Sequence, residues 1–353
     1  MTCKYYCITT ILIFLFSFGN LMAENLHTRY RNLALQGSIA SLVPELENPP
    51  KNLTEKEQQL VRNFSKRFGP NSEPDIVNTK WPLINDVVLA YHDYWKKVLL
   101  QNYSEDEREK MIYSSLREVL IKHSIHIPDS TDVLAIVADE FEKCGVTALT
   151  GKTLPHFDLL AWAKNDSVEY KVQLTDCSVD VIVFFMSDFV SYGWSHYATF
   201  GSAYPGGWAT SEALYCMGDD YDRESEKFKV SYLQHEGRHF ADYKQFPNLK
   251  SADLEYRAKL TELVFADTTL YQIIEKFIAN SKRQKDAPHS LANNEVIKQL
   301  SMEIFNKNYI IDIAKWKGID KIKIHSVANK LLEKSTQYLI LAGAETTEGL
   351  IKP

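Results

Sequence analysis

Two histidines and a glutamate in the pentapeptide His235-Glu236-Gly237-Arg238-His239 have the spacing of a metal centre. On a helix, imidazoles four residues apart face the same way, so both can bind one zinc ion. Glu236 lies beside the first imidazole, where its carboxylate can take a proton from a water held at the fourth coordination position. The motif therefore predicts a Zn²⁺ site formed by His235 and His239, with Glu236 as a general base.

The residues around the pentapeptide favour such a helix. Over residues 224–246, side chains at alternating spacings of four and three line one face, and Pro247 ends the segment. Gly237 would let a neighbouring element approach the helix closely. The alternative is an amphipathic helix whose histidines are ordinary surface or core residues.

A catalytic zinc ion needs a third protein ligand while its fourth position stays open to water. Asp242 follows His239 closely, but along a helix the seven residues from His235 to Asp242 span about 10 Å, too far for both to bind one ion. We therefore interpret Asp242 either as a carboxylate that supports a ligand or as a solvated helix charge.

The next predicted helix, residues 251–263, offers better ligands, with Ser251 as its expected N-cap. Glu255 and Glu262 lie seven residues apart and hence on nearly one face. We favour Glu255 as the third ligand, because it is near the helix start and Ala258 leaves room one turn later. Glu262 is the reserve candidate, and for either residue the alternative is a surface carboxylate.

With these residues the chain resembles the zincin metallopeptidases of the gluzincin type, in which H-E-x-x-H on one helix is joined by a glutamate from the following helix. The resemblance covers about residues 150–310. It implies an α+β, zincin-like fold. In that fold a small mixed sheet with a peptide-binding edge strand precedes the active-site helix, and a mostly helical C-terminal part holds the third ligand.

The sequence also departs from the known patterns of this superfamily. Asp242 and Gln245 stand where a metzincin has glycine and a third histidine, and Lys259 stands where the thermolysin-like E-x-x-x-D element has aspartate. No subfamily is therefore indicated.

A further histidine, His289, precedes a predicted helix that begins near Ser290. Metallopeptidases resembling this chain often place a His or Tyr opposite the zinc, where it stabilises the developing oxyanion. The resemblance implies this second catalytic role for His289, with Tyr256 and Tyr271 as rivals.

Before the metal helix, the sequence predicts strands over residues 168–173, 180–186 and 208–216. The last of these would lie just before the helix, where the family keeps the edge that pairs with an extended substrate. A plain sheet strand is the alternative.

The start of the chain predicts a secretory signal peptide over residues 1–23. Lys4 precedes an apolar run over residues 8–19, and Ala23 is a small residue suited to cleavage. We expect a secreted or periplasmic protein without stable membrane insertion after cleavage; an uncleaved anchor is the alternative. Of the cysteines that remain, Cys177 and Cys216 are the favoured disulfide pair.

Two regions follow the predicted signal peptide. Residues 24–149 form a helical N-terminal region, with helical periodicity over residues 54–68, 82–101, 104–123 and 131–144. Residues 150–353 form the zincin-like metallohydrolase domain. The composition, with 45% hydrophobic residues and a net charge of -6, is that of a globular protein. No basic stripe or phosphate-binding glycine loop indicates a nucleic-acid partner.

These features together predict an exported zinc-dependent metallopeptidase that acts on a peptide or protein substrate. One alternative is a secreted binding or scaffold protein with a structural or degenerate zinc site, and another is a zinc hydrolase of a non-peptide bond. Glu236 favours catalysis, because a structural site needs no base and usually closes its fourth position with another His or Cys.

Overall fold

The computed structural model describes residues 25–128, 132–218, 221–281, 288–343, 346 and 349–351. They form two compact units. The first comprises the described part of Met1–Ile127 with Gly151–Asp158 and Trp194–Ser202; the second comprises the described parts of Pro128–Thr150, Leu159–Gly193 and Ala203–Pro353. The chain thus passes between the units several times, whereas the sequence predicted one boundary after residue 149. The predicted signal peptide lies outside the described residues.

The first unit is mainly helical. Its elements are α1 (Leu26–Leu35), η1 (Ala40–Leu42), α2 (Val43–Glu47), α3 (Glu55–Arg67), α4 (Pro82–Leu100), α5 (Glu105–Lys122) and α7 (Trp194–Ala198). Thr54 and Ser104 begin α3 and α5 with capping boxes, in which the Glu57 and Glu107 carboxylates accept a hydrogen bond from the amide of the cap residue. These local signals explain why the helices of this region could be predicted from sequence.

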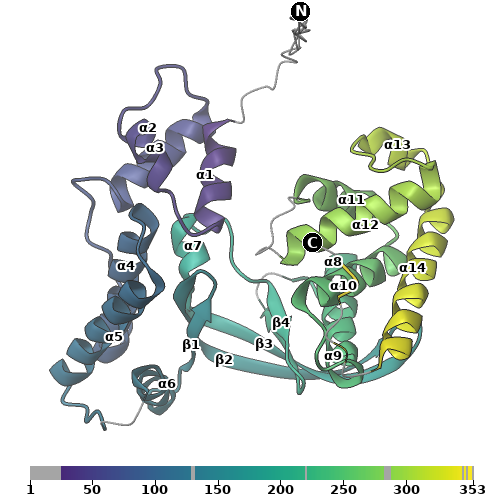
Figure 1. Cartoon of the computed structure of the whole chain (residues 1–353). Helices are drawn as coiled ribbons and strands as arrows, with labels where there is room; N and C mark the ends of the chain where they lie inside the picture. Colours follow the sequence, from purple (N-terminus) through teal and green to yellow (C-terminus); the bar gives the residue numbers. More distant parts are fainter. Residues whose placement is uncertain are drawn as a thin grey trace, which may run out of the picture. The chain divides into compact units, whose positions relative to one another are not determined.

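The second unit contains a five-stranded mixed sheet, so the predicted α+β class is confirmed (Figure 1). The strand order is β1-β2-β3-β5-β4. The strands are β1 (Thr147–Thr153), β2 (His156–Gln173), β3 (Ser178–Tyr192), β4 (Gly207–Ala209) and β5 (Leu214–Met217). The end of β1, the connection that follows it and the start of β2 are assigned to the first unit. β2 and β3 pair antiparallel, β3 and β5 pair parallel, and β4 returns antiparallel to β5.

The single strand predicted over residues 208–216 is wrong, because the chain turns within it. The amide of Thr210 donates to the carbonyl of Ala213 at 2.9 Å, and this turn separates the edge strand β4 from β5. The hydroxyl of Thr210 also accepts from the amide of Glu212 at 3.2 Å, so local side-chain bonding competes with a continuous strand.

The remaining helices belong to the second unit. They are α6 (Val133–Lys143), α8 (Glu226–Phe228), the π-helical η3 (Lys229–Gln234), α9 (His235–Gln245), α10 (Ser251–Phe265), α11 (Leu270–Ala279), α12 (Pro288–Phe305), α13 (Ile313–Lys317) and α14 (Lys321–Ala342). Lys250, not Ser251, is the N-cap of α10, and it makes no side-chain cap bond. Ser251 is instead the first helical residue, so that prediction is wrong.

One face of the sheet supports α9, the helix that carries His235 and His239. Residues that alternate along β3 and β5, such as Val183 and Leu214, pack with Phe228, Tyr232 and Phe240 in one buried cluster. Gly237 of α9 allows close contact with β2, because a Cβ atom there would lie 2.8 Å from Cγ1 of Val172. The close approach predicted from this glycine is therefore confirmed.

α10 is buried on every side, although its sequence is rich in charge. All residues from Asp253 to Leu263 are buried, and the apolar ones among them pack in part against α11, α12 and α14. Burying an unpaired charge costs several kcal/mol, so each charge on this helix requires a partner. Glu255, Arg257, Lys259 and Glu262 pair with oppositely charged or imidazole side chains, and Asp253 accepts a hydrogen bond from the amide of Ile351 at 2.8 Å.

A bidentate ion pair joins α10 to the metal helix. Nε and Nη2 of Arg257 donate to the two carboxylate oxygens of Asp242 at 2.7 and 2.9 Å, and both side chains are fully buried. The remaining Nη1 of Arg257 reaches Ser335 and Thr336 on α14 at 2.7 and 2.9 Å. Asp242 is therefore not a solvated charge; it is a buried partner of Arg257.

Three further expectations concern cysteines, charge and membranes. None of Cys144, Cys177 and Cys216 is in a disulfide; Cys216 is buried in β5, whereas Cys177 is exposed in the turn after β2, so the favoured pairing is not found.

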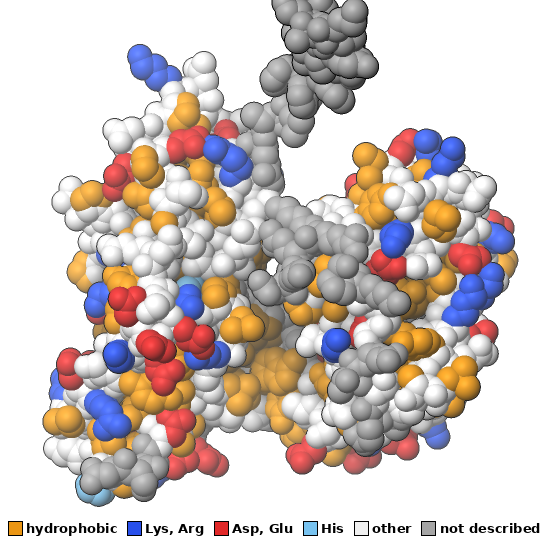
Figure 2. All heavy atoms as spheres, in the orientation of Figure 1, with side chains coloured by type: hydrophobic (Ala, Val, Ile, Leu, Met, Phe, Trp, Pro, Cys, Tyr) orange, Lys and Arg blue, Asp and Glu red, His pale blue; other side chains and the backbone are white. Residues whose placement is uncertain are grey.

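On the face drawn in Figure 2, Lys and Arg side chains are scattered among Asp and Glu. Within the described residues, no helix has the length and apolar character required to cross a membrane.

We predict that Asp242→Asn lowers the free energy of unfolding by about 3 kcal/mol or more, because it leaves Arg257 buried without its counter-charge. Urea denaturation followed by circular dichroism measures this change. Glu303→Gln is the control, since its ion pairs with Lys330 and Lys334 are partly exposed and should be worth about 1 kcal/mol or less. An equal effect of the two substitutions would contradict the prediction.

Candidate metal centre

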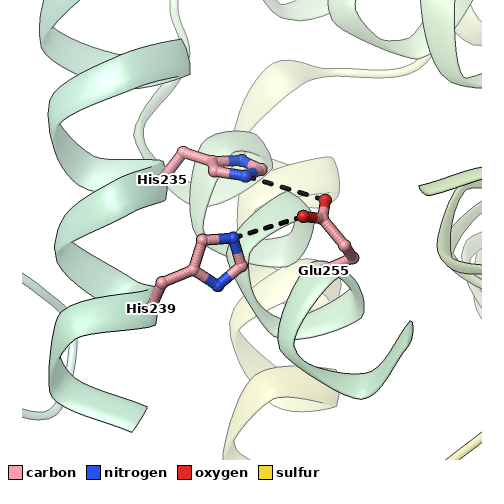
Figure 3. A group of neighbouring side chains, drawn as sticks. All are labelled: His235, His239 and Glu255. Carbon is pink, nitrogen blue, oxygen red and sulfur yellow. Dashed lines mark ion pairs between the residues drawn. The ribbon is translucent and has the colours of Figure 1, made fainter. Parts of the chain in front are cut away.

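The structure brings His235, His239 and Glu255 together in the second unit (Figure 3). The two imidazoles project from the same side of α9, one turn apart, and the Glu255 carboxylate faces them from α10. One potential ligand atom from each residue lies within 4.8 Å of the other two, and all three side chains are buried. Within the described part of the chain, this is the group identified as able to hold a metal ion.

The spacing of these atoms fits zinc. Two ligands that each lie about 2 Å from a tetrahedral zinc ion are about 3.3 Å apart. Nε2 of His239 lies 3.3 Å from Oε1 of Glu255, and Nε2 of His235 lies 3.7 Å from Oε2. Both distances exceed those of a charge-assisted hydrogen bond, about 2.8 Å. The two nitrogens and one carboxylate are also the donor set that zinc prefers.

Glu262 occupies a different position from a third ligand. Its Oε1 lies 2.7 Å from Nδ1 of His235, the ring nitrogen that faces away from Glu255. Such a carboxylate fixes the tautomer and the orientation of a ligating imidazole, and it raises the basicity of the ring. The seven-residue spacing of Glu255 and Glu262 thus places one carboxylate at each nitrogen of His235.

The Glu255 carboxylate has two further side-chain partners. Nδ1 of His289 lies 2.7 Å from Oε2, and Nζ of Lys259 lies 3.4 Å from the same oxygen. Burial alone would raise the pKa of Glu255, but contacts with His239 and His289 and the charge of His235 hold that pKa well below its usual range. The carboxylate is therefore ionised and oriented toward the imidazoles.

The surroundings of His235 favour a cation. Burial opposes its protonation, but the Glu262 hydrogen bond and the charges of Glu262, Glu255 and Glu236 raise its pKa to about 9. Three carboxylates surround this imidazole, whereas Lys259 pairs with one of them, Glu255. The same negative field that favours a proton there would favour a divalent ion between the two imidazoles.

Glu236 and Tyr243 border the ligands on α9. Glu236 is partly exposed, in contrast to the buried ligands, so its carboxylate has access to solvent. Burial, followed by the charges of Glu236 and Glu255, raises the pKa of Tyr243, which keeps its hydroxyl protonated. The Tyr243 ring lies 6.3 Å from that of His239. Sequence reasoning missed Tyr243, although its spacing of four residues from His239 placed it on the same helix face.

The expected donors of the oxyanion site are only partly brought together. His289, in the first turn of α12, contacts Glu255 through Nδ1 while its side chain remains 71% exposed. Tyr256 is buried in the core of α10, α12 and α14, and the Tyr271 hydroxyl donates to the carbonyl of Ile319 at 2.8 Å. Neither tyrosine therefore replaces His289, whose role in catalysis stays a prediction.

Comparisons of this chain with protein-family models, with curated proteins and with solved structures gave no match. The case for a metal centre therefore depends on the residues and distances of the chain itself.

We predict that Glu255→Ala abolishes zinc binding, because it removes one of three ligands. Elemental analysis after dialysis against dilute zinc should fall from about one ion per chain to less than about 0.1. Glu275→Ala, an exposed carboxylate on α11, is the control and should keep its zinc. Because Lys259 loses its partner in Glu255→Ala, circular dichroism must show that the variant is folded. Full zinc content in the folded variant would exclude Glu255 as a ligand.

Glu262→Gln should behave differently from Glu255→Ala. We expect zinc to bind at about one ion per chain but about 10- to 100-fold more weakly, because the support of His235 is weakened while all three ligands remain. Competition with a fluorescent zinc chelator measures the affinity. If Glu262→Gln lost zinc and Glu255→Ala kept it, Glu262 would be the third ligand.

Proposed function

We propose that the chain is an exported zinc-dependent peptidase of zincin-like fold. The observation that carries the proposal is the convergence of His235, His239 and Glu255 beside a partly exposed Glu236. A structural zinc site would need a fourth ligand in place of an open position. Among the described residues the group with mutually close ligand atoms ends at three, because His289 does not belong to it.

His235, His239 and Glu255 would hold the ion. Zinc bound there would lower the pKa of a water molecule and polarise the carbonyl of the bond to be cleaved. Glu236 takes the proton as the water attacks and then delivers it to the leaving amine. The Glu262 carboxylate keeps the His235 ring in position throughout, because its contact with Nδ1 leaves Nε2 facing Glu255.

An extended peptide has a place to bind in this proposal. β4 is the last strand of the sheet and pairs with β5, so no other strand of the described chain pairs with its outer edge. A peptide can add to such an edge through main-chain hydrogen bonds, which depend little on sequence. A backbone-directed site of this kind suits a peptide better than a small ester or other non-peptide substrate.

The decisive variant is Glu236→Gln, which keeps the shape of the side chain but removes its basicity. We expect cleavage of an unfolded, alkylated protein to fall by at least about 100-fold, while zinc remains near one ion per chain. Glu224→Gln, an exposed residue outside the helix, is the control and should retain activity. Product peptides are measured by mass spectrometry.

Unchanged turnover in Glu236→Gln would exclude Glu236 as the base. If the zinc-loaded wild type cleaved no peptide bond at all, the peptidase proposal would fail, and a scaffold or another hydrolase would take its place.

A further inference from the structure

Three aromatic side chains form a row across the sheet and end at its outer strand. Phe184 of β3 is paired with Tyr215 of β5, and Tyr215 is paired with Trp208 of β4. Their rings are stacked, with centroids 5.4 Å apart for the first pair and 5.1 Å for the second. The row therefore follows strand register, as expected for stabilising cross-strand pairs.

This row lies on the face of the sheet opposite the metal helix. Side chains alternate along a strand, and Leu214 and Cys216 belong to the buried cluster below α9, whereas Tyr215 and Met217 belong to a second cluster on the other face. Trp208 packs in this second cluster and is only partly buried. Its ring is also met by Trp162, at 6.4 Å and an angle of 66°, which fixes its orientation.

The neighbours of Trp208 on β4 are small. A Cβ atom on Gly207 would lie 2.3 Å from the Tyr215 carbonyl oxygen and 2.5 Å from Cε2 of Tyr232, so no side chain fits there. Ala209 packs toward the same helix side. β4 thus presents one large aromatic side chain on one face and almost no side chain on the other.

We propose that Trp208 selects substrates with an aromatic or large apolar residue at one fixed position. This inference rests on the proposed peptidase function and names the substrate class. A peptide paired with the outer edge of β4 places one of its side chains in register with Trp208, where it extends the row of Phe184, Tyr215 and Trp208 by one member. An aromatic or large apolar side chain there stacks on the indole, whereas a small or charged one does not.

The test is the cleavage-site profile of the zinc-loaded enzyme on a mixture of unfolded, alkylated proteins, read by mass spectrometry. Aromatic and large apolar residues should be enriched about three- to tenfold at one position relative to the cleaved bond. Trp208→Ala should remove that enrichment while leaving zinc content unchanged, and Trp208→Phe should retain most of it. Tyr338→Ala removes an aromatic side chain that is 40% exposed on α14, outside the sheet, and its profile should match the wild type.

Each outcome of this experiment either supports or overturns the role of Trp208. Enrichment that is lost in Trp208→Ala and kept in the other two variants supports the inference. Cleavage without a preferred position, or a preference unchanged in Trp208→Ala, overturns it and leaves the peptidase proposal intact. Absence of any cleavage by the wild type overturns both.

Discussion

The buried pair between Asp242 and Arg257 sets the relation of the two helices on which the candidate site depends. Arg257 donates to both oxygens of Asp242 and reaches α14 with its third nitrogen, so its planar group fixes direction as well as distance. A slide of α10 by one turn would leave Arg257 buried without its carboxylate partner. Two residues before Arg257, Glu255 meets the imidazoles, and five residues after it, Glu262 meets the far nitrogen of His235. The geometry of the candidate metal site therefore follows from the relative position of the two helices, which a pair outside the site fixes.

The sequence allowed prediction of those parts of the site that depend on local spacing. His235 and His239 share a face because four residues make about one helical turn, and the helical periodicity of apolar residues identified the N-terminal helices. The burial of α10 could not be predicted in the same way, because five charged residues in eleven are typical of a solvated helix. Lys259 pairs with Glu255 one turn away, but the other charges depend on contacts distant in sequence, such as that of Arg257 with Ser335. The turn between β4 and β5 was missed because the hydroxyl of Thr210 ends a segment whose composition otherwise favours a strand.

The candidate site departs from the zincin pattern at Lys259, and the charge of this lysine offsets that of the surrounding carboxylates. The thermolysin-like element has an acidic residue four positions after its glutamate ligand, and here a lysine stands at that position and contacts the candidate ligand Glu255 at 3.4 Å. Glu236, Glu255 and Glu262 bring three negative charges to the neighbourhood of His235. A divalent ion together with Lys259 would bring three positive charges. The reversed charge at this position therefore suits a centre in which the second carboxylate, Glu262, comes from one turn further along the helix.

Two glycines near α9 contribute to both parts of the proposed function, metal binding and peptide binding. Gly237 lets α9 lie directly against β2, and Gly207 lets β4 lie against Tyr232 of the segment that leads into α9. Because a Cβ atom at either position would collide with its neighbour, the helix and the edge strand are held at a short, fixed separation. Hydrolysis requires that the cleaved bond be held to within about 0.5 Å of its productive position relative to the base. A peptide paired with β4 would be positioned by the same packing that fixes His235 and His239. Trp208, on the opposite face of the sheet, would then select peptides by the side chain that lies in register with it.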